Sequence, residues 1–205
     1  MSYLSLIGLI FGIHLLAVMS PGPDFVMVLK NALQYNRKVA VYTALGISLG
    51  IGIHIIYSVA GIAYILKSNP KVFEIVKFMG AAYIIYMGYK TLQAKPVKMA
   101  MQTHQKQLIK PAEAIKIGFT TNVLNPKASL FFLSIFSLLI PPDVPLWVLL
   151  TISFMLIIVT FLWFAFVSVL ATNPLIEKKY ETYEPYILKT FGIILIGLGI
   201  AIFFE

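Results

Sequence analysis

Two ionisable side chains stand where apolar stretches of the chain are interrupted by proline. Asp24 follows the motif Ser20-Pro21-Gly22-Pro23 inside a hydrophobic run from Leu4 to Leu29, and Lys127 follows Asn125-Pro126 inside a later run. Proline removes a backbone donor and pushes the preceding residue toward extended geometry, so no helix passes through either motif undisturbed. We predict that the first helix stops near Ser20 and restarts at Pro23.

The first break offers groups that bind a cation. Asp24 supplies a carboxylate, and the backbone carbonyls near Leu16 to Ser20 lose their helical partners where Pro21 and Pro23 remove N–H donors. An ammonium group is the natural ligand for such a set. The alternative is that Asp24 only caps its own half-helix.

The second break offers groups that bind an anion. Asn125 is a good N-cap and Pro126 suits the first helical position, so a half-helix is predicted to begin there with unpaired N–H groups. Lys127 adds a positive charge where the helix dipole disfavours one, which indicates a bound carboxylate; Asn122 is expected to line the same break. The alternative is that Lys127 extends to the membrane surface. If the breaks meet, a zwitterionic amino acid finds a partner at each end.

The amino-acid composition indicates whether these breaks lie in water or in a membrane. Hydrophobic residues make up 60% of the chain, against roughly 45–50% in ordinary globular domains, and the mean hydropathy is +0.90. The chain is therefore predicted to be a membrane protein. The formal charge of +8 is concentrated in loops, so we expect no nucleic-acid partner. There is no cysteine, and His14, His54 and His104 lack metal-ligand spacing, so no metal or other cofactor is expected.

Six apolar runs predict an all-α protein with six transmembrane helices. Each has at least the roughly 17–25 residues that a span needs, and the first and fourth are longer, which leaves room for a break. The first run lacks a basic leader and a small-residue cleavage site, so we expect an uncleaved span rather than a signal peptide. The predicted spans are about Leu4–Leu29, Val39–Leu66, Val72–Leu92, Ala114–Ile140, Leu146–Ala171 and Tyr186–Phe204.

The two halves of the chain resemble each other. Pro23-Asp24 corresponds to Pro126-Lys127, Asn69-Pro70 to Asn173-Pro174, and Lys77 to Lys189, in the same order and at similar offsets. Three helices inserted twice in succession have opposite orientations. We therefore predict two inverted three-helix repeats, residues 1–92 and 113–205, joined by a basic cytoplasmic loop at 93–112.

The distribution of basic residues predicts the orientation. Loops after the first, third and fifth spans share one side, and twelve lysines and arginines fall on that side or its flanks against three on the other. Cytoplasmic loops carry the excess of such residues, so both termini are expected outside the cytoplasm.

Three motifs together resemble a known family. They are Ser20-Pro21-Gly22-Pro23, the segment Gly80-Ala81-Ala82-Tyr83-Ile84-Ile85-Tyr86-Met87-Gly88, and Asn122-Val123-Leu124-Asn125-Pro126-Lys127-Ala128 with Phe131-Phe132. The chain resembles the LysE/RhtB family of bacterial amino-acid exporters over essentially its whole length. The resemblance implies a protein of the bacterial inner membrane that exports amino acids such as lysine, threonine, homoserine or leucine, driven by the proton gradient. The sequence leaves open whether the unit is a monomer or a homodimer.

Other polar and small residues in the spans have structural alternatives. His14 and His54 can relay protons, or can simply bond to a backbone carbonyl. Tyr83 and Tyr86 can shape a cavity, or can belong to the membrane-interface belt or the core. The glycines are expected on faces where helices pack closely. These are Gly46, Gly50, Gly52, Gly80, Gly88, Gly192, Gly197 and Gly199.

Two other classes of function fit the sequence less well. A metal-cation exporter of similar architecture would place several acids or histidines in the spans, whereas Asp24, Glu74, His14 and His54 are the only candidates. An intramembrane enzyme would need paired carboxylates, a Ser/His pair or a metal motif, and none is visible, so we predict that the chain is not an enzyme. It also lacks the Gly-x-x-x-x-Gly-Lys motif of ATP-binding proteins.

Overall fold

The computed structural model describes residues 2–68, 70–94, 109–141 and 143–203, and all regular structure in these ranges is helical. This confirms the predicted all-α fold. The helices are α1 (Tyr3–Met19), α2 (Pro23–Gln34), α3 (Arg37–Ser68), α4 (Pro70–Leu92), α5 (Pro111–Val123), α6 (Pro126–Leu139), α7 (Leu146–Leu170) and α8 (Pro174–Phe203).

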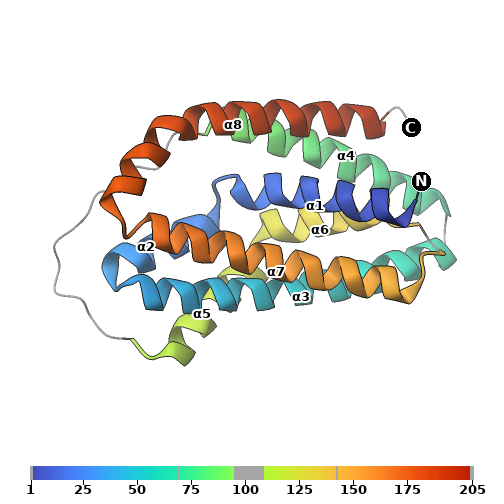
Figure 1. The fold of residues 1–205 in the computed structure, drawn as a ribbon. Coiled ribbons are helices and arrows are strands. Elements are labelled where there is room, and N and C mark those ends of the chain that lie inside the picture. Colours follow the sequence, from blue (N-terminus) through green and yellow to red (C-terminus); the bar gives the residue numbers. More distant parts are fainter. Residues whose placement is uncertain (1, 69, 95–108, 142, 204–205) are drawn as a thin grey trace.

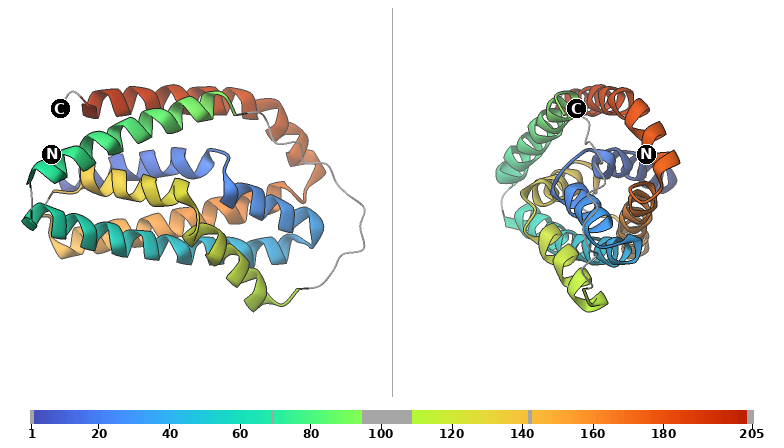
Figure 2. Two further views of the ribbon diagram at one scale, coloured as in Figure 1. Left: turned by 180° about the vertical axis from the view of Figure 1, so that it is seen from behind. Right: turned by 90° about the vertical axis from the view of Figure 1, so that its left-hand side faces the viewer.

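The long helices form two walls around two half-helices. α4 packs against α8 along one side of the molecule, and α3 packs against α7 along the other (Figure 1). α1 and α6 run between these walls, where α1 contacts α7 and α6 contacts both α3 and α4 (Figure 2). One half-helix from each break, α1 and α6, therefore lies between the two walls.

The first break has the predicted position. α1 ends at Met19, and Ser20 takes extended geometry (ψ 129°) before Pro21, as the proline requires. α2 begins at Pro23, whose missing N–H is harmless in a first turn, and it is bent 55° from α1.

The second break also follows the prediction. α5 ends at Val123, and Asn125 caps α6 by accepting a hydrogen bond on its side-chain oxygen from the Lys127 backbone N–H (3.0 Å). Pro126 occupies the first helical position. The two half-helices are bent by 59°.

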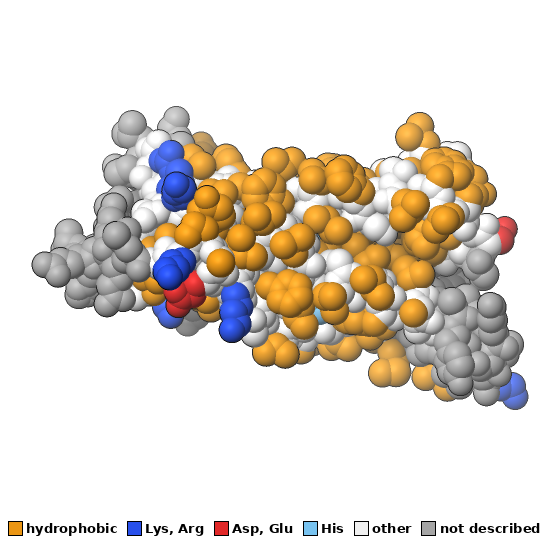
Figure 3. Space-filling model, turned by 90° about the horizontal axis from the view of Figure 1, so that it is seen from below, with side chains coloured by type: hydrophobic (Ala, Val, Ile, Leu, Met, Phe, Trp, Pro, Cys, Tyr) orange, Lys and Arg blue, Asp and Glu red, His pale blue; other side chains and the backbone are white. Residues whose placement is uncertain are grey.

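Four of the six predicted spans meet the length and apolarity expected of a membrane helix. Among the described residues these are α3 over Arg37–Gly61, α7 over Leu146–Leu170, and the bent pairs α1–α2 and α5–α6 if each counts as one span. The predicted spans on α4 and α8, and with them the six-span repeat, stay predictions. An apolar band of side chains covers the middle of the molecule, and basic side chains gather near one end of the face in view (Figure 3).

The sixth element differs from its prediction at the start. We expected a span from Tyr186, with a connection before it, but α8 begins at Pro174 and continues through Pro185. The polar stretch after Pro174 is therefore helical. A proline at a helix start is favourable, and this position let the helix begin a dozen residues before the apolar run.

Glycines bring helices into close contact at most of the predicted positions. A Cβ on Gly46 would overlap the Ile115 carbonyl of α5, and Gly88 and Gly192 face each other across α4 and α8. A Cβ on Gly50, Gly80 or Gly199 would also come too close to atoms of a neighbouring helix. The prediction was wrong for Gly52 and Gly197, where a Cβ would meet one side-chain atom at 4.0 Å or nothing. Gly118, which packs on Thr43 of α3, was missed.

Candidate functional site

The two helix breaks lie against each other, and Lys127 joins the second break to the first. Its Nζ donates to the Ser20 carbonyl at 2.8 Å and to the carbonyls of Ala17 and Pro21 at 3.4 Å each. These carbonyls lie at the end of α1, where the helix has no further N–H groups to offer them. The charge of Lys127 is thus directed inward.

Asp24 is held from the opposite direction. Its Oδ2 accepts hydrogen bonds from Asn122 Nδ2 (2.9 Å) and Asn125 Nδ2 (3.0 Å), both in the second break. Its Oδ1 is buried and has no hydrogen-bond partner. Asp24 also lies in the first turn of α2, where the helix dipole favours a negative charge.

The breaks are therefore satisfied reciprocally. The cation of the second break bonds the carbonyls of the first, and the carboxylate of the first accepts the amides of the second. Gly22 makes this close approach possible, because a Cβ there would lie 3.2 Å from Cδ and 3.3 Å from Nζ of Lys127. Neither break keeps these partners without the other.

A cavity opens at this junction. It comprises about 440 Å³ of space between atoms, part of which is open to the outside of the protein. Its lining comes from both breaks and from α1, α3, α4, α6 and α7. The lining residues are His14, Ala17, Val18, Ser20, Gly22, Asp24, Phe25, Ile51, Met87, Asn125, Lys127, Ala128, Phe131, Phe132, Thr160 and Phe164.

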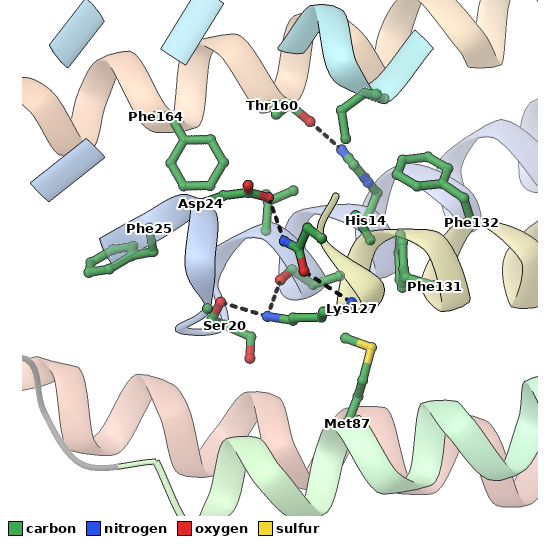
Figure 4. Close-up of a pocket in the computed structure, with 16 residues that line it drawn as sticks. His14, Ser20, Asp24, Phe25, Met87, Lys127, Phe131, Phe132, Thr160 and Phe164 are labelled. Atoms are coloured by element: carbon green, nitrogen blue, oxygen red, sulfur yellow. Dashed lines mark hydrogen bonds between the residues drawn. The ribbon is translucent and has the colours of Figure 1, made fainter. Parts of the chain in front are cut away.

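The cavity lining has two chemically different parts. Ser20, Asp24, Asn125 and Lys127 gather where the breaks meet, whereas Phe131 and Phe132 lie together on α6 beside His14 (Figure 4). Thr160 of α7 bonds to His14 in this second part, at 2.8 Å from Nε2. The cavity therefore presents charge where the breaks meet, with Phe25 and Phe164 beside Asp24, and mainly aromatic surface with one polar pair at the opposite end (Figure 4).

The chain can now be compared with known proteins. The profile of the family described as LysE type translocator matches residues 15–205. The chain belongs to this family. It is 30% identical over 190 residues to the threonine efflux protein of Escherichia coli (strain K12), with 92% of each chain covered. No solved structure matches the chain.

Two further relatives show the range of the LysE-type chains that it resembles. It is 32% identical over 138 residues to the leucine efflux protein of Klebsiella pneumoniae, covering 66% of this chain and 62% of that protein. It is 29% identical over 191 residues to an uncharacterized membrane protein of Bacillus subtilis (strain 168), covering 89% and 91%. The family resemblance drawn from the motifs is confirmed.

Most of the predicted site residues of this LysE-type chain lie at the junction of the two breaks. Only some of them line the cavity. Ser20, Gly22, Asp24, Asn125 and Lys127 line it. Pro21, Pro23, Asn122 and Pro126 shape the breaks without being part of the cavity lining. The Ser20 hydroxyl is directed toward α4, where it bonds Thr91 (2.8 Å).

The two histidines have separate surroundings. His14 lines the cavity, whereas His54 of α3 lies behind the second break, with its Nε2 2.9 Å from the Asn122 carbonyl oxygen and its Nδ1 bonded to Tyr57. Both make the backbone contact that the structural alternative predicted, since His14 Nε2 lies 3.2 Å from the Leu156 carbonyl oxygen.

The two tyrosines predicted to shape a cavity, Tyr83 and Tyr86, also have different surroundings. Tyr83 is half-buried and donates from its hydroxyl to the Lys127 carbonyl (3.2 Å), so it supports the first turn of α6. Tyr86 is 51% exposed, with the Lys90 ammonium 5.8 Å from its ring centre. Neither is among the residues that line the cavity.

Several cavity residues were missed in the sequence. Thr160 could have been found, because it is a polar residue near the middle of the predicted span Leu146–Ala171. Phe25 adjoins the first motif, and Phe131 and Phe132 belong to the family motif, yet none was assigned to the site. Met87 and Phe164 gave no signal that separates them from ordinary core residues.

The described part of the chain contains no cluster of side chains that could bind a metal ion. Within residues 2–68, 70–94, 109–141 and 143–203, no three histidine or acidic side chains lie close enough together to hold a metal ion.

Proposed function

We propose that the chain is a secondary transporter that exports amino acids across the bacterial cytoplasmic membrane in exchange for protons. The single observation that carries the proposal is the junction of the two breaks, where a carboxylate and an ammonium line one end of a cavity whose other lining residues are mainly apolar. Free amino acids carry both charges on one carbon, and their side chains extend from it. Two relatives are named for threonine efflux and leucine efflux, which supports the same class of substrate.

The hydrogen bonds around the cavity indicate how the zwitterion binds. The carbonyls at the end of α1 are already bonded to Lys127, so the acceptor left for a substrate ammonium is Asp24 Oδ1, which is buried without a partner. The substrate carboxylate binds beside the Lys127 ammonium and the first turn of α2, which has no side-chain cap. The two breaks thus bind the two ends of the amino-acid backbone.

Asp24 also supplies a reason for exchange with protons. A substrate ammonium and a proton both neutralise the same carboxylate, and a charged carboxylate is costly inside a membrane. Each therefore displaces the other from Asp24. Asn122 donates its side-chain amide N–H to this carboxylate, and its backbone carbonyl oxygen lies 2.9 Å from His54 Nε2, so His54 helps to position the amide that binds Asp24.

The proposed orientation puts both termini outside the cytoplasm and the two three-helix repeats in opposite directions. The start of α1 and the end of α8 lie at the same end of the bundle, opposite the connection between α2 and α3 (Figure 1). Because the chain lacks cysteine, single introduced cysteines and an impermeant thiol reagent can test this on intact cells. Asp143→Cys should label and Gln34→Cys should not; the reverse pattern would overturn the orientation.

Transport itself is tested in proteoliposomes. Vesicles are loaded with one amino acid at a time, a pH gradient is imposed, and the efflux is compared with that from protein-free vesicles. We expect faster efflux of at least one small neutral amino acid, and a loss of that excess when the gradient is collapsed. Equal rates with and without protein for every amino acid would refute the proposal, and divalent cations measured in the same vesicles would test the cation-exporter alternative.

A further inference from the structure

The apolar end of the cavity contains one side chain whose polar atom has no partner. His14 extends from α1, is 1% exposed, and points toward Thr160 on α7 (Figure 4). Its Nε2 lies 2.8 Å from the Thr160 hydroxyl oxygen and 3.2 Å from the Leu156 carbonyl oxygen. Its Nδ1 is buried and makes no hydrogen bond.

The partners of Nε2 determine the tautomer of His14. A carbonyl oxygen only accepts, so the contact with Leu156 requires a hydrogen on Nε2. The Thr160 hydroxyl donates its own hydrogen to the same carbonyl (2.9 Å), which leaves its oxygen as an acceptor for His14 as well. The neutral ring therefore carries its lone pair on Nδ1. This atom is an acceptor without a donor.

The surroundings of the ring offer that acceptor nothing. The rings of Phe131 and Phe132 lie 5.9 and 5.8 Å from the imidazole centre. Ile51 and Met87 are apolar members of the same lining. A buried acceptor left unpaired is costly, so a bound molecule that supplies a donor here gains more than one that supplies a methyl group.

We propose that His14 selects amino acids that carry a side-chain hydroxyl, by accepting a hydrogen bond from that hydroxyl on Nδ1. The inference rests on the proposed function, since it assumes that the charged end of the cavity holds the amino-acid backbone. The side chain then extends toward the aromatic end. A hydroxyl fits there because it is a neutral donor, whereas a charged side chain would be buried among phenylalanines.

Isosteric amino acids give the sharpest test. Threonine and valine have nearly the same shape and differ by a hydroxyl in place of a methyl, and serine differs from 2-aminobutyrate in the same way. We expect the parent protein to export threonine faster than valine, and serine faster than 2-aminobutyrate, by at least about fivefold at equal low concentrations. This is the lower end of the roughly 5- to 150-fold that one unpaired buried group corresponds to.

Two variants assign the preference to His14. In His14→Gln the side-chain amide can keep the contact with Thr160 but leaves no group at the position of Nδ1, and in His14→Phe both nitrogens are removed. Each should reduce the threonine-to-valine ratio to below about twofold, mainly through slower threonine export, because valine makes no hydrogen bond to Nδ1 in the parent. Ser137→Ala on α6 is the control, because Ser137 is buried like His14 but does not line the cavity, so the ratio should remain at the parental value.

The ratio separates this inference from the proposed function. Threonine and valine exported equally by the parent would overturn the role of His14 and leave amino-acid export standing, and this result needs no variant to fold. A parental ratio that persists in both His14 variants would also overturn it. No export of any amino acid by the parent would refute the proposed function, and with it the inference.

Discussion

The two helix breaks have similar backbone geometry but carry side chains of opposite charge. Each ends a half-helix before a proline, with bends of 55° and 59°. The second is capped by its own asparagine side chain, whereas the first has Gly22 at the cap position and no side-chain bond there. The first places an acid in the opening turn of α2, as the dipole favours, but the second places Lys127 where the dipole disfavours it.

The difference shows where the second break obtains its stability. Lys127 is not compensated by its own helix, but by the carbonyls at the end of α1. Lys127 also explains why the first break has no side-chain cap. A residue larger than glycine at position 22 would meet the Lys127 side chain. Each break is incomplete alone, so a ligand that disturbs one changes the partners of the other.

The largest effect is expected from removing one break altogether. Replacing Pro21, Gly22 and Pro23 by alanine favours a continuous helix, by about 3 kcal/mol for each proline and about 1 for the glycine. The α1 carbonyls would then bond within the helix and release Lys127. We expect export in proteoliposomes to fall by at least about a hundredfold, and parental export by a correctly inserted triple variant would contradict a role for the break.

The second prediction removes both charges and keeps both breaks. A single charge left in the membrane interior costs roughly 2.5–3.5 kcal/mol, so Asp24→Asn or Lys127→Met alone can lower abundance as well as activity. The double variant Asp24→Asn with Lys127→Met avoids that cost. We expect near-parental abundance with export below about a tenth of the parent.

The double variant distinguishes a binding pair from a structural pair. If the charges served only to hold the breaks together, export per folded molecule would recover along with abundance. Abundance is measured by size-exclusion chromatography in detergent, and export is normalised to it. Export above about a tenth of the parental value, a gap of roughly 1.4 kcal/mol in the barrier, would exclude the assigned site.

The positions of both breaks could be predicted from the sequence, because proline acts on its immediate neighbours. The end of α1 follows from Pro21, and the starts of α2 and α6 follow from Pro23 and Pro126. The early start of α8 could not be predicted in this way. Its first turns are polar, so hydrophobicity placed the element at the apolar run instead.

The direction of the Lys127 side chain was beyond the sequence. Spacing fixes where a residue lies along its helix, but its partners depend on how α6 is rotated and which helix faces it. The sequence therefore predicted the α1 carbonyls and Lys127 as separate binding groups, and the structure bonds them to each other. The partner of Thr160 was beyond the sequence for the same reason, since His14 is 146 positions away.

The third prediction tests whether the α1 carbonyls form an ammonium site. Lys127→Ala leaves three carbonyls without their donor, and a small primary alkylammonium ion such as propylammonium can replace it. We expect propylammonium to raise the melting temperature of the purified variant by several degrees and to leave the parent unchanged. Tetramethylammonium is the control, because it has the charge but no N–H donor. An equal effect of the two ions would mean that charge alone is sensed.

The smallest effect is expected from the caps themselves. Asn125→Ala removes the side-chain bond to the Lys127 N–H and one amide from Asp24, so it should cost about 1 kcal/mol or more. For a protein of this size that corresponds to a melting temperature lower by roughly 2–4 °C. Gly22→Ala removes no cap bond, and its Cβ meets only the flexible end of Lys127, so the shift should be smaller. Thermal unfolding of both variants in the same detergent measures the difference. A larger loss in Gly22→Ala than in Asn125→Ala would mean that the approach of Lys127 to the first break, rather than the cap of the second, limits stability.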